Sequence, residues 1–447
     1  MYFMKMTLRF LLVLMLLPLM VKAQNTSVPT SVETPKESDV RVSFLTCAPG
    51  HQSYRLYGHT AIRVDNPMDT KEDWVYNYGW FSFDTPNFVM KFVFGLTDYS
   101  MAQQSTALFL SAHIHDDMPV TQQVLNLTPE QAAKVKADLQ SVLTENGYDR
   151  REFYAQGIDR VDTLVTNTPN WTYRYSFLRD NCTTRAVETI VKAIEATGET
   201  VVYPTLKSST QTLTHRGMIH EFTHSSPWQE FGQDILLGAE VDRVYSIQEM
   251  TRANFLPTYA EDFFRVAKIK SKDGSMRPLV ASTEPLFPFT PNPQQPALPF
   301  GPNLVFGTLL ALAVLLTFGE QRSRRQPQAN RRAWRIWTGA FDLTLLIGMG
   351  LTGGFIAFMV VLSEHPGVSP NWLLTIFHPL WLIYAGLYIW MRKRDRRDYF
   401  ALLMTACALA YFGVFALGIQ QFPLATVALA CILLIRGVAI FFRPQKA

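Results

Sequence analysis

Cys182 stands where an extended segment meets an amphipathic helix. The apolar positions after it recur at the spacing of one buried helix face, and they are Val187, Ile190, Val191 and Ile194. Gly198 follows as a typical helix-ending residue. The free N–H groups and the dipole of a helix N-terminus favour a thiolate, lower the cysteine pKa and stabilise an oxyanion. The sequence therefore predicts that Cys182 is a nucleophile.

A thiolate that acts at neutral pH usually needs a neighbouring base, and His59 is the leading candidate. The alternation of residues 59–64 predicts a strand with His59, Ala61 and Arg63 on one face and Thr60, Ile62 and Val64 on the other. Asp65-Asn66-Pro67 marks a turn, and residues 74–79 form the returning strand. Asn77 on that strand is expected to lie beside His59 and orient its ring. The predicted catalytic set is Cys182, His59 and Asn77.

Less reactive interpretations of these residues remain open. Cys182 could be an inert buried thiol or form a disulfide with Cys47, because this part of the chain is expected to reach an oxidising compartment. His59 alone could be an ordinary core or surface histidine. Asn77 could simply bond to the backbone.

Residues 1–23 are predicted to form a secretory signal peptide. Lys5 and Arg9 precede an apolar run from Phe10 to Met20, and Val21-Lys22-Ala23 provides a small-x-small cleavage site. An uncleaved signal anchor is the alternative, and either places the chain from Gln24 onward outside the cytoplasm. Residues 24–284 are then expected to form an exported catalytic domain.

A proline-rich linker, residues 285–302, separates this domain from a membrane domain over residues 303–443. Each of five apolar runs is near the roughly 20 residues that a bilayer requires. The predicted spans are Leu304–Phe318, Trp337–Leu362, Trp372–Met391, Phe400–Leu417 and Leu424–Phe442.

The distribution of basic residues predicts the orientation of these spans. The loops after the first and third spans are rich in arginine, whereas Ser363–Asn371 and Gly418–Pro423 contain no Lys or Arg. By the positive-inside rule the basic loops are cytoplasmic, which agrees with the signal peptide. The expectation is a multi-pass protein of the inner membrane with its catalytic domain on the periplasmic side. Many of the basic residues behind the net charge of +4 then serve to orient the membrane spans, so nucleic acid is not an expected partner.

We predict no metal and no cofactor, because the chain has no glycine-rich phosphate loop and no paired-cysteine metal spacing. His215, His220 and His224 lie close together in sequence, but a histidine-rich helix edge is more often solvated than metal-binding.

The order of histidine, asparagine and helix-start cysteine resembles circularly permuted papain-like enzymes, including the lecithin:retinol acyltransferase type. Asn181-Cys182 fits the pattern of that group. The resemblance implies an α+β fold, with a permuted papain-like (NlpC-type) exported domain followed by a five-helix transmembrane bundle.

A closer resemblance, to the Lnb family, covers nearly the whole chain. The stretches that carry it are Tyr57-Gly58-His59-Thr60-Ala61-Ile62-Arg63, Tyr76-Asn77-Tyr78-Gly79, Asn181-Cys182-Thr183-Thr184, Leu237-Gly238 with Asp242, Phe255-Leu256-Pro257 and Glu364-His365-Pro366. It implies a lipoprotein N-acyltransferase that moves an acyl chain from a phospholipid to the α-amino group of a diacylated lipoprotein. Related eukaryotic phospholipid N-acyltransferases have a histidine in place of Asn77, so this chain departs from them there.

Several polar residues are weaker candidates for substrate binding. Arg185, one turn after Cys182, could hold a donor phosphate, or it could be a solvated or salt-bridged surface residue. Glu364, His365 and His378 are expected near the outer leaflet, where they could bind substrate or anchor the protein. For Asp342 and Arg436, snorkelling or mutual pairing is the simpler account.

Two other classes of function are compatible with the same sequence features. A membrane-anchored papain-like cysteine peptidase or amidase would need the same three residues, but a soluble peptide substrate would not require five membrane spans. A non-catalytic membrane scaffold would not need Cys182.

Overall fold

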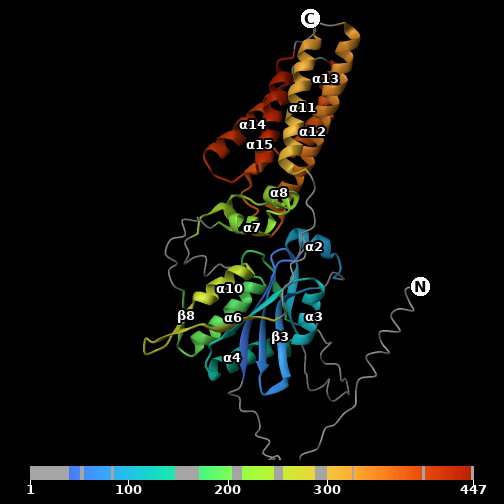
Figure 1. The fold of residues 1–447 in the computed structure, drawn as a ribbon. Coiled ribbons are helices and arrows are strands. Elements are labelled where there is room, and N and C mark those ends of the chain that lie inside the picture. Colours follow the sequence, from blue (N-terminus) through green and yellow to red (C-terminus); the bar gives the residue numbers. More distant parts are fainter. Residues whose placement is uncertain are drawn as a thin grey trace, which may run out of the picture. The chain divides into compact units, whose positions relative to one another are not determined.

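The computed structural model describes residues 40–50, 55–81, 85–145, 171–203, 214–245, 255–286, 300–324, 327–394 and 398–443 (Figure 1). The predicted signal peptide, residues 1–23, and most of the proline-rich linker lie outside the described residues.

A seven-stranded sheet in the order β10-β5-β1-β2-β3-β4-β6 is the centre of the periplasmic part, and each neighbouring pair is antiparallel. The strands are β1 (Arg41–Cys47), β2 (His59–Asn66), β3 (Asp69–Trp80), β4 (Asp98–Ser105), β5 (Val120–Leu125), β6 (Tyr173–Arg174) and β10 (Val280–Pro285). The hairpin predicted around Asp65-Asn66-Pro67 is present, because β2 pairs with β3. Val75 lies opposite Arg63 in it.

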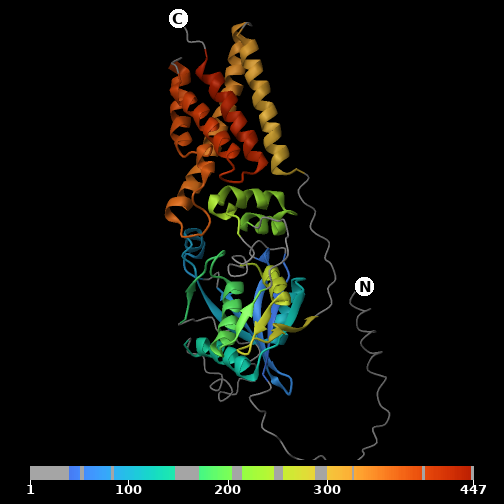
Figure 2. The same ribbon diagram turned by 90° about the vertical axis from the view of Figure 1, so that its left-hand side faces the viewer.

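Helices cover both faces of this sheet (Figures 1 and 2). These helices are α3 (Thr106–His115), α4 (Pro129–Glu145), α6 (Cys182–Ala196) and α10 (Pro257–Val266), and a further short helix, α2 (Phe88–Phe94), has no buried residue. Ile62 and Val64 of β2 pack in one core with residues of α4, α6 and α10, whereas Ala61 packs on the other face with Phe109 of α3. The alternation of β2 therefore separates two cores, as the sequence predicted.

Two further groups of elements follow α6 in the chain. The strands β7 (Thr200–Val202), β8 (Lys268–Lys270) and β9 (Met276–Pro278) form a three-stranded antiparallel sheet. The helix α7 (His215–Thr223) and the short 3-10 helix η4 (Ala239–Asp242) are held by a third apolar cluster that includes Met218, Val241 and Phe255. Ile235 and Leu236 of α8 (Pro227–Leu236) pack instead against the apolar cluster of the bundle.

Among the described residues, five segments are long and apolar enough to cross a membrane. They contain α11 (Pro302–Ser323), α12 (Gln328–Leu362), η5 (Trp372–Thr375) with α13 (Leu380–Arg394), α14 (Tyr399–Ala416) and α15 (Leu424–Phe441). The first and second spans begin earlier than predicted. The third is not one continuous helix: it is a 3-10 turn and a helix that starts after Pro379, which cannot donate a backbone N–H.

Buried charges within the bundle neutralise one another. Arg436 lies 2.6 Å from Asp342 and 3.3 Å from Glu320, and all three side chains are buried. The mutual pairing of Asp342 and Arg436 considered from the sequence is therefore present, and it avoids an isolated charge in an apolar environment.

The two loops without Lys or Arg are the ones that contact the periplasmic part. The amides of Gly238 and Ala239 donate to the carbonyls of Gly367 and Pro370 at 2.8 and 2.7 Å. In the second loop, Gln420 Nε2 donates to the Leu237 carbonyl at 3.0 Å. These contacts agree with the orientation that the charge distribution predicted.

Candidate active site

The N-terminus of α6 is built around Asn181. Its side-chain oxygen accepts from the amides of Thr183 and Thr184, at 2.9 and 3.0 Å, and the Thr184 hydroxyl accepts from the Asn181 amide. This capping box begins the helix at Cys182. The buried face comprises Cys182, Thr183, Ala186, Ile190, Ala193 and Ile194, so it is rotated from the predicted one: Val187 and Val191 lie only at its edge.

Asn181 also fixes the helix start to its surroundings. Its side-chain nitrogen donates to the carbonyls of Phe177 and Phe255, at 2.8 and 2.7 Å. The Phe255-Leu256-Pro257 motif, one of the stretches that carry the family resemblance, thereby holds the residue that precedes the cysteine. Phe255 and Leu256 are fully buried.

His59 and Asn77 meet across the sheet. Nε2 of His59 lies 3.0 Å from Oδ1 of Asn77. Because an amide oxygen can only accept, this contact leaves the proton on Nε2 and makes Nδ1 the nitrogen available to a thiol. The Nδ2 group of Asn77 is buried without a partner among the described residues.

Cys182 and His59 share a hydrogen bond, with the thiol buried and the imidazole half-buried. Burial alone would raise the pKa of the Cys182 thiol, but the charge and hydrogen bond of His59, the Thr60 backbone and the Thr183 hydroxyl together lower it. Burial likewise opposes protonation of His59, but the Cys182 charge and the hydrogen bonds of Cys182 and Asn77 raise its pKa. The two shifts favour a thiolate–imidazolium pair.

Tyr173 contributes a buried hydroxyl near the thiol. A Cβ atom placed on Gly79 would lie 3.8 Å from the Tyr173 hydroxyl oxygen and 3.7 Å from the Cβ of Cys182, so both groups border the same glycine. The hydroxyl has no hydrogen-bond partner among the described residues. Burial raises the pKa of Tyr173 well above its ordinary value, and the adjacent Cys182 adds to the effect, so the phenol is a donor at neutral pH.

The second periplasmic cysteine is close but unbonded. Cys47 is the register partner of His59, and both Cys47 and Cys182 are buried free thiols. Burial raises the pKa of Cys47 well above its ordinary value. The two cysteines thus differ in the direction of their pKa shifts, and only Cys182 shares a hydrogen bond with the histidine.

The weaker candidates have partners within the protein. Arg185 pairs with Asp180 at 2.6 Å, and its guanidinium lies 3.7 Å from the ring centroid of Tyr173. Glu364 pairs with Arg174 at 2.9 Å. His365 and His378 bond to backbone groups, namely the Phe92 carbonyl at 2.6 Å and the Leu380 amide at 3.2 Å.

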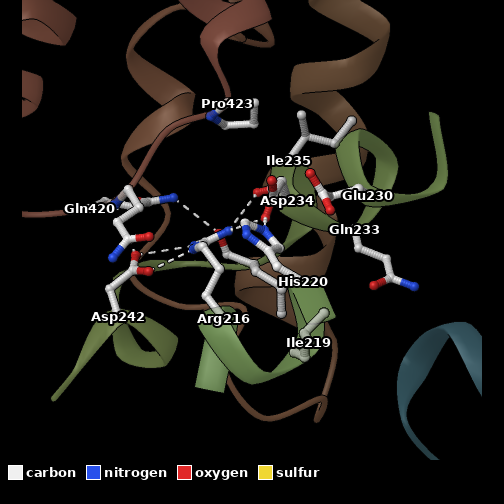
Figure 3. A network of polar contacts seen from close by, with 12 residues as sticks. Arg216, Ile219, His220, Glu230, Gln233, Asp234, Ile235, Asp242, Gln420 and Pro423 are labelled. Atoms are coloured by element: carbon white, nitrogen blue, oxygen red, sulfur yellow. Dashed lines mark hydrogen bonds and ion pairs between the residues drawn. The ribbon is translucent and has the colours of Figure 1, made fainter. Parts of the chain in front are cut away.

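A second polar cluster lies in α7, α8 and η4 (Figure 3). The guanidinium of Arg216, only 1% exposed, is 2.8 Å from Asp234 and 2.6 Å from Asp242. Asp242 also accepts from the Gln421 amide at 3.0 Å, which ties the cluster to the loop between α14 and α15. The sequence singled out Asp242 only through the family resemblance and did not identify Arg216.

The histidines of this region do not form one solvated edge. His224 is exposed, but His215 is buried, and burial lowers its pKa to about 4. His220, Glu230 and Asp234 offer three potential metal ligands within 4.8 Å of one another. Nε2 of His220 is already bonded to Asp234, whose charge Arg216 balances, and Glu230 accepts from Thr223. These contacts make the cluster a structural network.

An exported α+β domain with a paired thiol and imidazole, followed by five apolar spans, defines a multi-pass inner-membrane protein with a periplasmic N-terminal domain. Two family models match the chain: the Lnb N-terminal periplasmic domain over residues 33–212 and the Lnb transmembrane domain over residues 293–447. The chain belongs to the Lnb family. No curated protein and no solved structure matches it, so the permuted papain-like relationship stays a prediction.

Proposed function

We propose that this protein is a lipoprotein N-acyltransferase that carries an acyl chain from a phospholipid on Cys182 to the α-amino group of a diacylated lipoprotein. The observation that carries the proposal is the hydrogen-bonded pair of Cys182 and His59, with Asn77 on the far nitrogen of the imidazole. Its attachment to a membrane domain favours a lipid donor over a soluble peptide.

In the first step the Cys182 thiolate attacks the carbonyl carbon of an acyl ester in the phospholipid. The S–C bond forms, the tetrahedral oxyanion collapses, and the ester C–O bond breaks. Protonated His59 gives its Nδ1 proton to the departing alcohol oxygen, so a lysophospholipid leaves and an acyl thioester remains on Cys182.

In the second step the lipoprotein amine attacks the thioester. A model α-amino group has a pKa of about 7.7 to 8, so neutral His59 needs to accept only a weakly held proton. The amide C–N bond forms, the C–S bond breaks, and the thiolate–imidazolium pair returns. Exclusion of water from the buried pair limits loss of the thioester to hydrolysis.

Both tetrahedral intermediates need donors for their oxyanion. The amides at the start of α6 are one source, although the Asn181 side chain already occupies those of Thr183 and Thr184. We assign the second donor to the Tyr173 hydroxyl, which is buried and protonated beside Gly79 and has no partner in the part of the chain that the structure describes. Such a donor is most effective where water is excluded.

The test is the acylation state of lipoproteins in cells that depend on this gene. Cys182→Ala should abolish N-acylation at normal protein abundance, and Cys47→Ala is the matched control because it removes the other buried periplasmic thiol. Unchanged triacylated lipoproteins in the Cys182→Ala strain would reject the proposal.

A further inference from the structure

Helix α2 exposes apolar side chains at the surface of the periplasmic part. None of its seven residues is buried, and the exposed fractions of Val89, Met90 and Phe92 are 70%, 57% and 49%. Lys91 is the only charged residue in it. Contiguous exposed apolar residues of this kind mark contacts with proteins or membranes.

The end of α2 is joined to the periplasmic end of membrane helix α12. Three consecutive residues after α12 donate to the last three carbonyls of α2: Ser363 Oγ to Val93 at 2.9 Å, the Glu364 amide to Phe94 at 2.8 Å, and His365 Nε2 to Phe92 at 2.6 Å. The last carbonyls of a helix lack partners within it, and of these three only that of Phe92 also accepts from the Gly95 amide, so the loop completes the end of α2. The role of His365 here is to hold that helix.

This junction places α2 level with the end of a membrane span. The rings of Phe94 and Phe358 meet edge to face, with centroids 4.9 Å apart. Val361 and Leu362, the last residues of α12, are also exposed. An apolar helix held at that level is continuous with the lipid-facing surface of the bundle, and Lys91 can extend toward lipid phosphates while its stem stays apolar.

A row of aromatic rings connects α2 to the thiol. Phe92 stacks on Phe88 and Phe88 on Phe81, with centroid distances of 6.1 and 5.4 Å. Phe81 then contacts Tyr99 at 5.0 Å, and Tyr99 contacts Tyr175 at 4.3 Å.

Tyr175 ends the row beside the nucleophile. Its ring edge would lie 3.6 Å from a Cβ atom on Gly79, the same position that is 3.7 Å from the Cβ of Cys182. A continuous row of ring contacts thus runs from the exposed helix, through the buried ring of Tyr99, to the site.

We propose that α2 is embedded in the outer leaflet of the inner membrane and that its aromatic row guides a phospholipid acyl chain to Cys182. The inference rests on the proposed function and adds the route by which the donor reaches the thiol. The occupant is lipid rather than a protein partner because α2 continues the surface of a membrane span.

Photocrosslinking tests the contact with lipid. The full chain, in vesicles of phosphatidylethanolamine and phosphatidylglycerol, carries p-benzoylphenylalanine at Met90 or, as the control, at Met68. Met68 is 79% exposed and lies in the turn after β2, at the opposite end of that strand from His59. Crosslinks to phospholipid at position 90 and not at 68 are expected. Equal crosslinking at both positions, or crosslinks from position 90 to protein only, would overturn the proposal.

A donor comparison tests the route. Met90→Asp should slow Cys182 acylation by vesicle phospholipid at least about tenfold, since a carboxylate is disfavoured in the apolar part of a bilayer. Acylation by water-soluble p-nitrophenyl butyrate should not change, and Met68→Asp should change neither rate. Equal loss with both donors, or no loss with phospholipid, contradicts the proposal. Failure of the unsubstituted protein to acylate Cys182 would instead reject the proposed function.

Discussion

The hydroxyl of Thr60 lies 3.0 Å from the hydroxyl of Thr183, and this buried contact joins the histidine strand to the cysteine helix. Thr60 directly follows His59, and Thr183 directly follows Cys182. The Thr183 hydroxyl also lies 3.9 Å from the Cys182 sulfur. One hydrogen bond therefore sets the spacing of the two reacting groups.

Replacing Thr183 by valine should raise the activation free energy of acyl transfer by more than it lowers the free energy of unfolding. The change leaves the Thr60 hydroxyl buried without its partner, at a cost of about 1–3 kcal/mol. It also removes a group that lowers the pKa of Cys182. Thr183→Ser, which keeps the hydroxyl, is the control. The account would be in error if the valine and serine variants had the same rate of Cys182 acylation.

The thiol–imidazole pair predicts an unusual pH dependence of alkylation. Cys182 should react with iodoacetamide well below pH about 8.5, the usual pKa of cysteine, because its pKa is lowered. In His59→Ala the opposing effect of burial remains, so reaction should shift to higher pH. The acyl-transfer rate should fall at low pH as the thiolate is lost and at high pH as His59 loses its proton. Mass spectrometry of the Cys182 peptide separates this thiol from the others, and identical pH profiles for both proteins would contradict the pairing.

Tyr173→Phe should reduce the rate of thioester formation by about 100-fold if the hydroxyl stabilises the oxyanion. Substrate binding and thermal stability should change little, because the hydroxyl has no partner to lose among the described residues. Tyr78→Phe is the matched control, since Tyr78 is also buried but its hydroxyl bonds to Thr189 at 3.1 Å. Equal rates for the two variants would exclude Tyr173 as a donor.

Arg216, the buried cation of α7, is expected to contribute more to the free energy of unfolding than an exposed arginine does. Arg216→Leu leaves Asp234 and Asp242 as unpaired buried carboxylates and should cost about 3–5 kcal/mol. Arg265→Leu removes a more exposed ion pair with Glu261 and should cost under about 1 kcal/mol. Denaturant unfolding of the full chain in detergent measures both, and a similar small loss for the two variants would refute the ranking.

The sequence predicted the elements that have strong local patterns. The β2–β3 hairpin, the helix after Cys182 and the five spans follow from residue periodicity and from runs of apolar residues, whereas the α+β class came from the family resemblance. The rotation of the α6 face was missed because packing against β2 and β3 decided which side of α6 is buried. The break in the third span near Pro379 was also missed.

The polar surroundings of the site were harder to predict because they join residues far apart in sequence. Thr60 meets Thr183 across 123 positions, and Asn181 meets Phe255 across 74. A signal for Tyr173 was present, since aromatic residues alternate at Trp171, Tyr173 and Tyr175. Nothing in that pattern indicates that one hydroxyl is left unpartnered beside Gly79.

The mass of the adduct on Cys182 tests the central claim most directly. Protein isolated from vesicles that contain phospholipid but no lipoprotein acceptor should carry one acyl group on the Cys182 peptide. Hydroxylamine should remove that group, and addition of a diacylated lipopeptide should transfer it to the amine. An unmodified Cys182 under these conditions, in protein that still N-acylates the lipopeptide, would contradict the account.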